Sequence, residues 1–172
     1  MTAYDDTVHR KVPTPPEDWD AINRTAQQVL KVKRLHPDAV LPQYATDGAA
    51  CFDLRVIECA QQHPVYDTVP FRTGLAFEVP DGHVLLVFSR SGHGFKNATR
   101  LGNCVGVIDA DYRGEVLVAL RRDGTRADVL RVNPGDRIAQ AMLVPIPRVQ
   151  LVEVGELTDT ARGAGGFGST GA

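Results

Sequence analysis

Short apolar runs alternate with polar turns along most of this chain. From Val29 onward, ten runs of four to seven residues stand between turns that contain Gly, Asp, Asn or Pro. No amphipathic helical pattern of 12 or more residues follows position 29. Many short strands at close spacing predict an all-β barrel or jelly roll. The predicted strands cover residues 29–35, 51–57, 68–71, 75–79, 84–89, 105–108, 115–120, 129–132, 139–145 and 149–154.

The two ends of the chain differ from this middle part. Residues 1–28 are polar, and Pro13, Pro15 and Pro16 precede acidic residues, which is a helix-start signal. We therefore expect a short N-terminal helix from about residue 16 to residue 28. The domain organisation that follows is an N-terminal extension (1–28), a β domain (29–157) and a flexible Gly-rich tail (158–172).

Composition narrows the class of protein. A chain of 172 residues is most simply one domain with a real core. The net charge of −2 gives no basic excess for binding a nucleic-acid polymer. No apolar run approaches about 18 residues and no signal-peptide core is present, so we expect a soluble cytoplasmic protein without membrane contact.

The cysteines argue against a disulfide framework or a zinc site. Cys51, Cys59 and Cys104 are odd in number and lack CxxC spacing, as is usual in a reducing compartment. Cys51 and Cys104 stand in apolar runs, which predicts that both are small buried hydrophobes.

Candidate chemistry is concentrated in the turns. The block 101–115 is predicted to be a hairpin in which Asp109, Asp111 and Tyr112 lie between two apolar runs. The carboxylates can serve as a general base or a cation site, or Asp and Gly can simply make the turn. In a second block, Arg90, Ser91 and Gly92 form either an anion cradle or a polar turn. His93, in the same block, is predicted to be a loop residue without a second His at metal-ligand spacing.

Two further blocks carry polar side chains on predicted strands. Arg137 and Gln140 follow an Asn-Pro-Gly-Asp turn, where ordinary surface polarity is the default explanation. Asp53 is a carboxylate within an apolar strand, which is costly without a partner, so a hydrogen-bonded or metal-linked role is expected.

The last eleven residues, from Arg162 to Ala172, contain five Gly with one Arg, one Phe, one Ser and one Thr. Backbone N–H groups, hydroxyls, a cation and an aromatic ring suit a phosphorylated ligand over which the tail becomes ordered. A P-loop is excluded because it requires a Lys before the Ser/Thr and a helix after it. A plain flexible terminus is the alternative.

Together and in this order, the five blocks resemble the five motifs of the homotrimeric dUTP pyrophosphatase (dUTPase) family. The resemblance runs from about residue 29 to the end, with Ser89 where the family usually has Pro and with residues 58–67 outside the pattern. The blocks are Ala49-Ala-Cys-Phe-Asp-Leu54, Ser89-Arg-Ser-Gly92, Gly102-Asn-Cys-Val-Gly-Val-Ile-Asp-Ala-Asp-Tyr-Arg-Gly114, Gly135-Asp-Arg-Ile-Ala-Gln140 and Arg162-Gly-Ala-Gly-Gly-Phe-Gly-Ser-Thr-Gly171.

The resemblance implies a jelly-roll homotrimer with shared active sites at the subunit interfaces. It also implies Mg2+-dependent hydrolysis of dUTP to dUMP and pyrophosphate, which keeps uracil out of DNA and supplies dUMP for thymidylate synthesis. Asp109 occupies the position of the aspartate that activates the water attacking the α-phosphorus, and Asp53 acts indirectly. No direct protein ligand to the metal is expected, because Mg2+ would be held by substrate phosphates and water.

The remaining roles follow from the same resemblance. Tyr112 would exclude a 2′-OH, and Asn103 with the backbone of neighbouring residues would bind the uracil edge. The catalytic set is Asp109, Asp53, Arg90 and Gln140. The substrate-binding set is Ser91, Gly92, Asn103, Gly106, Val107, Ile108, Tyr112, Arg137, Arg162, Gly166, Phe167 (stacked on uracil), Gly168, Ser169 and Thr170. Two alternatives share the fold: a dCTP deaminase-like enzyme, and a trimeric nucleotide-binding regulator that uses residues 1–28 or 58–67 as an interface.

Overall fold

The computed structural model describes residues 28–60, 68–123, 132–167 and 169. The N-terminal helix predicted for residues 16–28 and the strand predicted for 129–132 fall almost entirely outside these ranges, as do Gly168 and Thr170. The division of the chain at residues 28 and 157 therefore stays a prediction. No helix in the described ranges has both the length and the apolar character needed to cross a bilayer.

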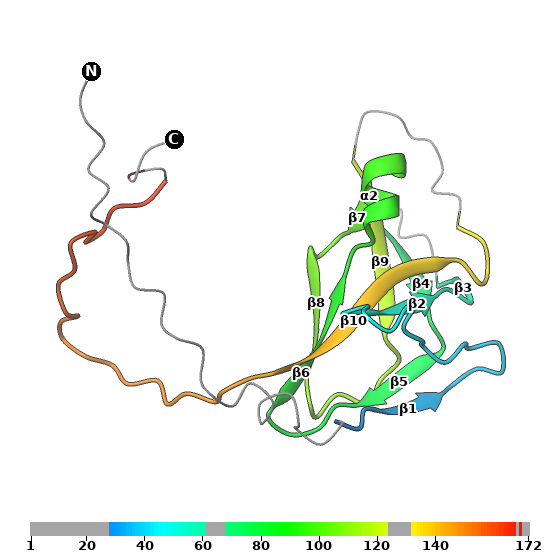
Figure 1. The fold of residues 1–172 in the computed structure, drawn as a ribbon, viewed down its shortest axis with the longest axis horizontal. Coiled ribbons are helices and arrows are strands. Elements are labelled where there is room, and N and C mark those ends of the chain that lie inside the picture. The colour runs from blue at the N-terminus through cyan, green and yellow to red at the C-terminus, as the bar shows by residue number, and fades with distance from the viewer. Residues whose placement is uncertain (1–27, 61–67, 124–131, 168, 170–172) are drawn as a thin grey trace.

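In the described part of the chain, ten antiparallel strands form two four-stranded sheets and one two-stranded sheet (Figure 1). The first sheet has the order β2 (Phe52–Arg55), β10 (Arg137–Pro145), β6 (His83–Phe88) and β8 (Val105–Ile108). The second has the order β3 (Glu58–Cys59), β4 (Thr68–Arg72), β9 (Leu117–Arg122) and β7 (Thr99–Leu101). β1 (Lys31–Arg34) pairs with β5 (Leu75–Glu78), and one short helix, α2 (Ser91–Asn97), follows β6. The predicted all-β jelly-roll class is confirmed.

The core lies between the sheets because apolar side chains alternate along the strands. In β2, Phe52 and Leu54 are buried while Asp53 and Arg55 lie on the outer face. Burying one Leu side chain completely contributes roughly 2 kcal/mol. The largest of the fully buried apolar side chains are Phe77, Leu54, Leu75, Leu85, Leu101, Leu120, Ile138, Val116 and Val118.

Three sequence-based predictions about structure are wrong. The segment 149–154 is not a strand, and Leu151 is 91% exposed, since this segment joins none of the three sheets of the described residues. Cys104 is exposed because it lies in a turn, where its φ is 64°. His93 lies in α2 and not in a loop. The apolar pattern does not predict β3, β7 or α2, because these elements are too short to leave a periodic pattern.

The predicted hairpin around Asp109 is wrong as well. β8 pairs with β6, whereas β9 pairs with β4 and β7, so β8 and β9 belong to different sheets. Residues 109–116 therefore connect one sheet to the other. Neighbouring strands in sequence pair in only about two-thirds of cases, and the apolar pattern does not identify the exceptions.

Candidate functional site

A β-bulge in β10 places two polar side chains on one outer face. Arg137 and Gln140 are three residues apart and would lie on opposite faces of a regular strand. The register of β10 against β2 shifts between Arg137 and Ala139, and both Ile138 and Ala139 are buried. The extra residue brings Arg137 and Gln140 to the same side. Gln140 lies opposite Asp53.

The Asp53 carboxylate has two arginine partners. Arg90 Nε donates to Oδ1 at 2.8 Å, and Arg137 Nη1 donates to Oδ2 at 3.1 Å. The Asp53 side chain is only 16% exposed, so these charge-assisted bonds offset the cost of removing the carboxylate from water. The expectation that Asp53 has a partner is confirmed.

Backbone acceptors complete this cluster. The Arg137 carbonyl lies 3.2 Å from Arg90 Nη1 and 2.8 Å from His93 Nε2. Gln140 Nε2 donates to the Ser89 carbonyl at 3.0 Å, and the Ser89 hydroxyl accepts the Leu101 N–H at 2.9 Å. Ser91 and Gly92 are exposed at the start of α2 beside this cluster. The contacts of His93 and Ser89 with this cluster join residues more than 40 positions apart, so no local sequence pattern predicts them.

A separate hollow of about 260 Å³ contains Asp109 and Tyr112. The Tyr112 N–H donates to the Asp109 carbonyl at 3.2 Å, which closes a tight turn. The Tyr112 ring lies against Gly114, where a Cβ atom would come within 2.6 Å of Tyr112 Cζ. Tyr112 therefore requires Gly at 114. The hollow is lined by Val107, Ile108, Asp109, Tyr112, Glu115, Val116 and Leu117.

Asn103 lies next to Gly106 across the turn between β7 and β8. A Cβ atom on Gly106 would lie 3.1 Å from Val87 Cβ and 3.9 Å from Asn103 Nδ2. The Val105 N–H donates to the Asn103 carbonyl at 2.7 Å, with Cys104 between them in the left-handed region. The residues expected to bind a base thus follow one another along the turn and β8.

The two groups of candidate residues are far apart in one protomer. Ile108 pairs with Leu85, so Asp109 lies near the His83 end of β6. Arg90 follows the other end of β6, roughly 20 Å away at about 3.4 Å per residue. The structure therefore brings together residues 53, 90, 137 and 140, and separately 107–109 and 112, but not the two groups.

Comparison with known proteins identifies the family. The family model described as dUTPase matches residues 38–171. This chain belongs to the dUTPase family. A deoxyuridine 5'-triphosphate nucleotidohydrolase of Nautilia profundicola is 44% identical over 142 residues, which cover 83% of this chain and 98% of the relative. The nucleotidohydrolase of the same name from Hamiltonella defensa is 44% identical over 141 residues, covering 81% and 92%.

Solved dUTPase structures have the same fold. The Staphylococcus bacteriophage 80alpha dUTPase with dUPNHPP superimposes with a TM-score of 0.72 at 27% identity. The match covers 84% of this chain and 99% of the phage protein. The dUTPase from phage phi11 of S. aureus gives a TM-score of 0.64 at 25% identity and covers 77% and 100%.

In this dUTPase-family chain, residues 158–167 of the tail lie away from the strands that carry both groups (Figure 1). In the described part of the tail, hydrogen bonds are local: Arg162 Nε donates to the Gly165 carbonyl at 2.8 Å, and the Ser169 N–H donates to the Gly166 carbonyl at 3.1 Å. Phe167 is fully exposed. Arg162, Gly166, Phe167 and Ser169 therefore contact neither group in this protomer.

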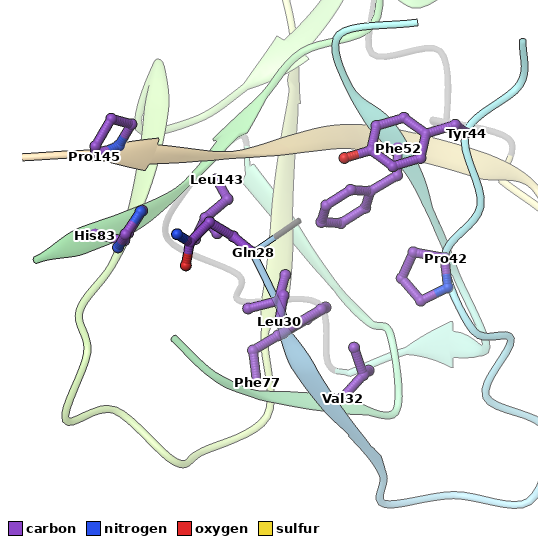
Figure 2. A pocket seen from close by; sticks show the side chains of 10 residues that line it. All are labelled: Gln28, Leu30, Val32, Pro42, Tyr44, Phe52, Phe77, His83, Leu143 and Pro145. Carbon is purple, nitrogen blue, oxygen red and sulfur yellow. The ribbon is translucent and has the colours of Figure 1, made fainter. Parts of the chain in front are cut away.

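A second hollow, of about 580 Å³, is mainly apolar and lies between the β1–β5 sheet and the β2–β10 edge (Figure 2). Figure 2 shows Phe52, Phe77 and Leu30 near its centre, while His83 lies toward one end. Within the described residues, no group of three or more His, Cys, Asp or Glu is placed to hold a metal. The hollow is lined by Gln28, Leu30, Val32, Pro42, Tyr44, Phe52, Phe77, His83, Leu143 and Pro145.

Proposed function

We propose that this chain hydrolyses dUTP to dUMP and pyrophosphate, which keeps uracil out of DNA and supplies dUMP for thymidylate synthesis. The observation that carries the proposal is the shared hollow of Asp109 and Tyr112 in a chain of the dUTPase family. A reaction on a free nucleotide fits a cytoplasmic enzyme.

Asp109 is the proposed general base. Its side chain is exposed at the end of β8, where a water molecule can reach it. It would take a proton from a water whose oxygen forms a bond to the α-phosphorus. The bond from the α-phosphorus to the oxygen that bridges to the β-phosphorus breaks, and pyrophosphate leaves with that oxygen.

Specificity would come from the walls of the Asp109 hollow and from β8. The Tyr112 ring would lie against the deoxyribose and leave no room for a 2′-OH. Asn103 and the backbone of Gly106, Val107 and Ile108 would bind the uracil edge. Cytosine presents the reversed donor and acceptor pattern and would leave those groups unpaired, which is costly.

The phosphates would bind the cluster around Asp53. Arg90, Ser91, Gly92, Arg137 and Gln140 provide cations, a hydroxyl and an amide at one end of β6. Asp53 is a positioning residue, because both its oxygens accept hydrogen bonds from the two arginines. The tail would close over the nucleotide, with Phe167 on uracil and with Arg162, Gly166, Gly168, Ser169 and Thr170 near the phosphates.

Mg2+ is the proposed cofactor. Because both Asp53 oxygens already have arginine partners, the chemistry of this cluster fits a metal carried by the substrate phosphates and water. When bound, Mg2+ would neutralise charge on the triphosphate. Arg90 and Arg137 would add positive charge on the same side.

A homotrimer with shared active sites is also part of the proposal. The separation of Asp109 from Arg90 supports it, because a single protomer does not bring the base to the phosphate cluster. The exposed apolar side chains of residues 149–157 support it too, since a partner subunit would cover them. These side chains belong to Val149, Leu151, Val152, Val154 and Leu157.

The test is pyrophosphate release from dUTP with Mg2+, with dCTP, dTTP and UTP in parallel. We expect fast turnover of dUTP alone. Asp109→Asn should lower kcat by about a thousandfold while dUTP still binds, because the base is lost and the pocket shape is kept. Unchanged turnover in this variant would refute the role of Asp109. Ammonia release from dCTP would replace the proposal by a deaminase.

A further inference from the structure

The Tyr112 hydroxyl is hydrogen-bonded to the backbone of Glu115, three residues further along the chain. It donates to the Glu115 backbone carbonyl at 3.1 Å. Glu115 also lines the hollow that contains Asp109 and Tyr112. The position of the Tyr112 ring in this hollow therefore depends on the position of the Glu115 backbone.

The Glu115 side chain is held by an arginine and a backbone amide. Arg72 approaches its carboxylate through two nitrogens: Nε donates to Oε2 at 3.0 Å, and Nη2 lies 3.0 Å from the same oxygen. The Gly74 N–H donates to Oε1 at 2.7 Å. The Glu115 side chain is only 18% exposed, so these bonds are shielded from competing water. Arg72 is in turn bound by Glu58.

The next residue fixes the same segment to the core. The Val116 N–H donates to the Leu75 carbonyl at 2.8 Å, and the hydroxyl of the buried Thr73 donates to the Val116 carbonyl at 2.6 Å. Val116 itself is buried. The Glu115 side chain and the Val116 backbone thus both form hydrogen bonds to residues 73–75, where β4 is joined to β5.

We infer that Glu115, held by Arg72, is a positioning residue that fixes the Tyr112 ring and thereby sets the discrimination between deoxyribose and ribose. This inference rests on the proposed function. A steric wall rejects one added hydroxyl only if it does not move, because a small displacement of the ring makes room for that oxygen. The Arg72–Glu115 pair and the hydroxyl of Tyr112 prevent that displacement.

Glu115→Gln and Tyr112→Phe test the inference separately and together. Glu115→Gln removes the negative charge that pairs with Arg72. Tyr112→Phe removes only the hydrogen bond from the Tyr112 hydroxyl to the Glu115 carbonyl. Each is expected to raise the ratio of kcat/KM for UTP to that for dUTP by about tenfold. In the double variant the two effects should not add, because both act through the position of one ring. Melting temperatures identify a variant that does not fold, in which case Tyr112→Phe alone decides.

The matched control is Asp123→Asn. Asp123 forms an Arg–carboxylate pair outside the site, in which Arg100 Nε lies 2.7 Å from Asp123 Oδ2, and the substitution removes the charge of this pair. Its UTP to dUTP ratio should equal that of the wild type. An unchanged ratio in Glu115→Gln or in Tyr112→Phe, with dUTP hydrolysis retained, would overturn this inference alone. Fully additive effects would also overturn it. Absence of dUTP hydrolysis in the wild type would overturn the proposed function and this inference with it.

Discussion

Asp109 and Arg90 lie at opposite ends of the β6–β8 pair in one protomer. Asp109 follows Ile108, which pairs with Leu85, whereas Arg90 follows Phe88 at the other end of β6. A general base and a phosphate-binding arginine that act on one nucleotide cannot be separated by roughly 20 Å of strand. The proposed reaction therefore requires Asp109 and Arg90 from different subunits.

Subunit mixing tests this requirement. Asp109→Asn and Arg90→Gln should each be inactive alone, and a refolded equal mixture should regain about a quarter of the wild-type activity from random pairing in closed oligomers. In such a mixture, a site works when Asp109 comes from the Arg90→Gln chain and Arg90 from the Asp109→Asn chain. Pyrophosphate release measures the recovery, and size-exclusion chromatography verifies assembly. A mixture as inactive as its components would refute the shared site.

Asp53→Asn should destabilise the protein more than Asp123→Asn. Asp53 is largely buried and binds two arginines, so its loss leaves both without their charged partner and costs about 2 kcal/mol. The Arg100–Asp123 pair is solvent-exposed, and exposed pairs contribute little. Urea denaturation of both variants measures the difference. Equal loss of stability in the two variants would show that the Asp53 cluster is not a stabilising element.

Leu151→Asp should weaken self-association without unfolding the protomer. Leu151 is 91% exposed in the described structure, so a charge there should leave the protomer fold intact and disturb only a contact with a partner subunit. Sedimentation velocity should show a shift towards monomer at unchanged secondary structure. Glu153→Asp, two residues away, is the control and should leave the oligomer intact. An intact oligomer in Leu151→Asp would exclude this segment from the interface.

Thiol labelling near pH 8 should distinguish Cys51 from the other two cysteines. Partial burial raises the pKa of the Cys51 thiol, and the neighbouring Asp53 carboxylate raises it further. A raised pKa lowers the thiolate fraction, so Cys51 should react with iodoacetamide more slowly than the exposed Cys59 and Cys104. Mass spectrometry of the labelled peptides measures the three rates. Fast labelling of Cys51 would contradict the burial of this thiol.

Much of the fold follows from the period of the apolar residues. Eight of the ten predicted strands have a counterpart in the structure, because apolar and polar residues alternate where one strand face is buried. The failure at residues 149–154 has a physical reason. Alternation indicates only that a segment is suited to strand pairing, and residues 149–154 pair with no strand in the part of the chain that the structure describes, where their large apolar side chains are exposed.

The candidate site was predictable as a set of residues but not as an arrangement. The block order identified Asp53, Arg90 and Asp109, but not which of them lie together. Which of these residues lie together depends on the strand order, in which β10 lies between β2 and β6. It also depends on the bulge in β10, which no local sequence pattern predicts. The contacts of Glu115 and His93 join residues more than 40 positions apart, so they too were outside the reach of sequence reasoning.

Residues 109–116 connect the two sheets, and this has a consequence for how a ligand would affect the whole barrel. A nucleotide held between Asp109 and Tyr112 would oppose any sliding of β8 relative to β9. Amide hydrogen exchange in both sheets would then slow together when the hollow is filled, although the ligand contacts only one loop. The stability of the contact between the two sheets would therefore increase as more of the protein binds the ligand.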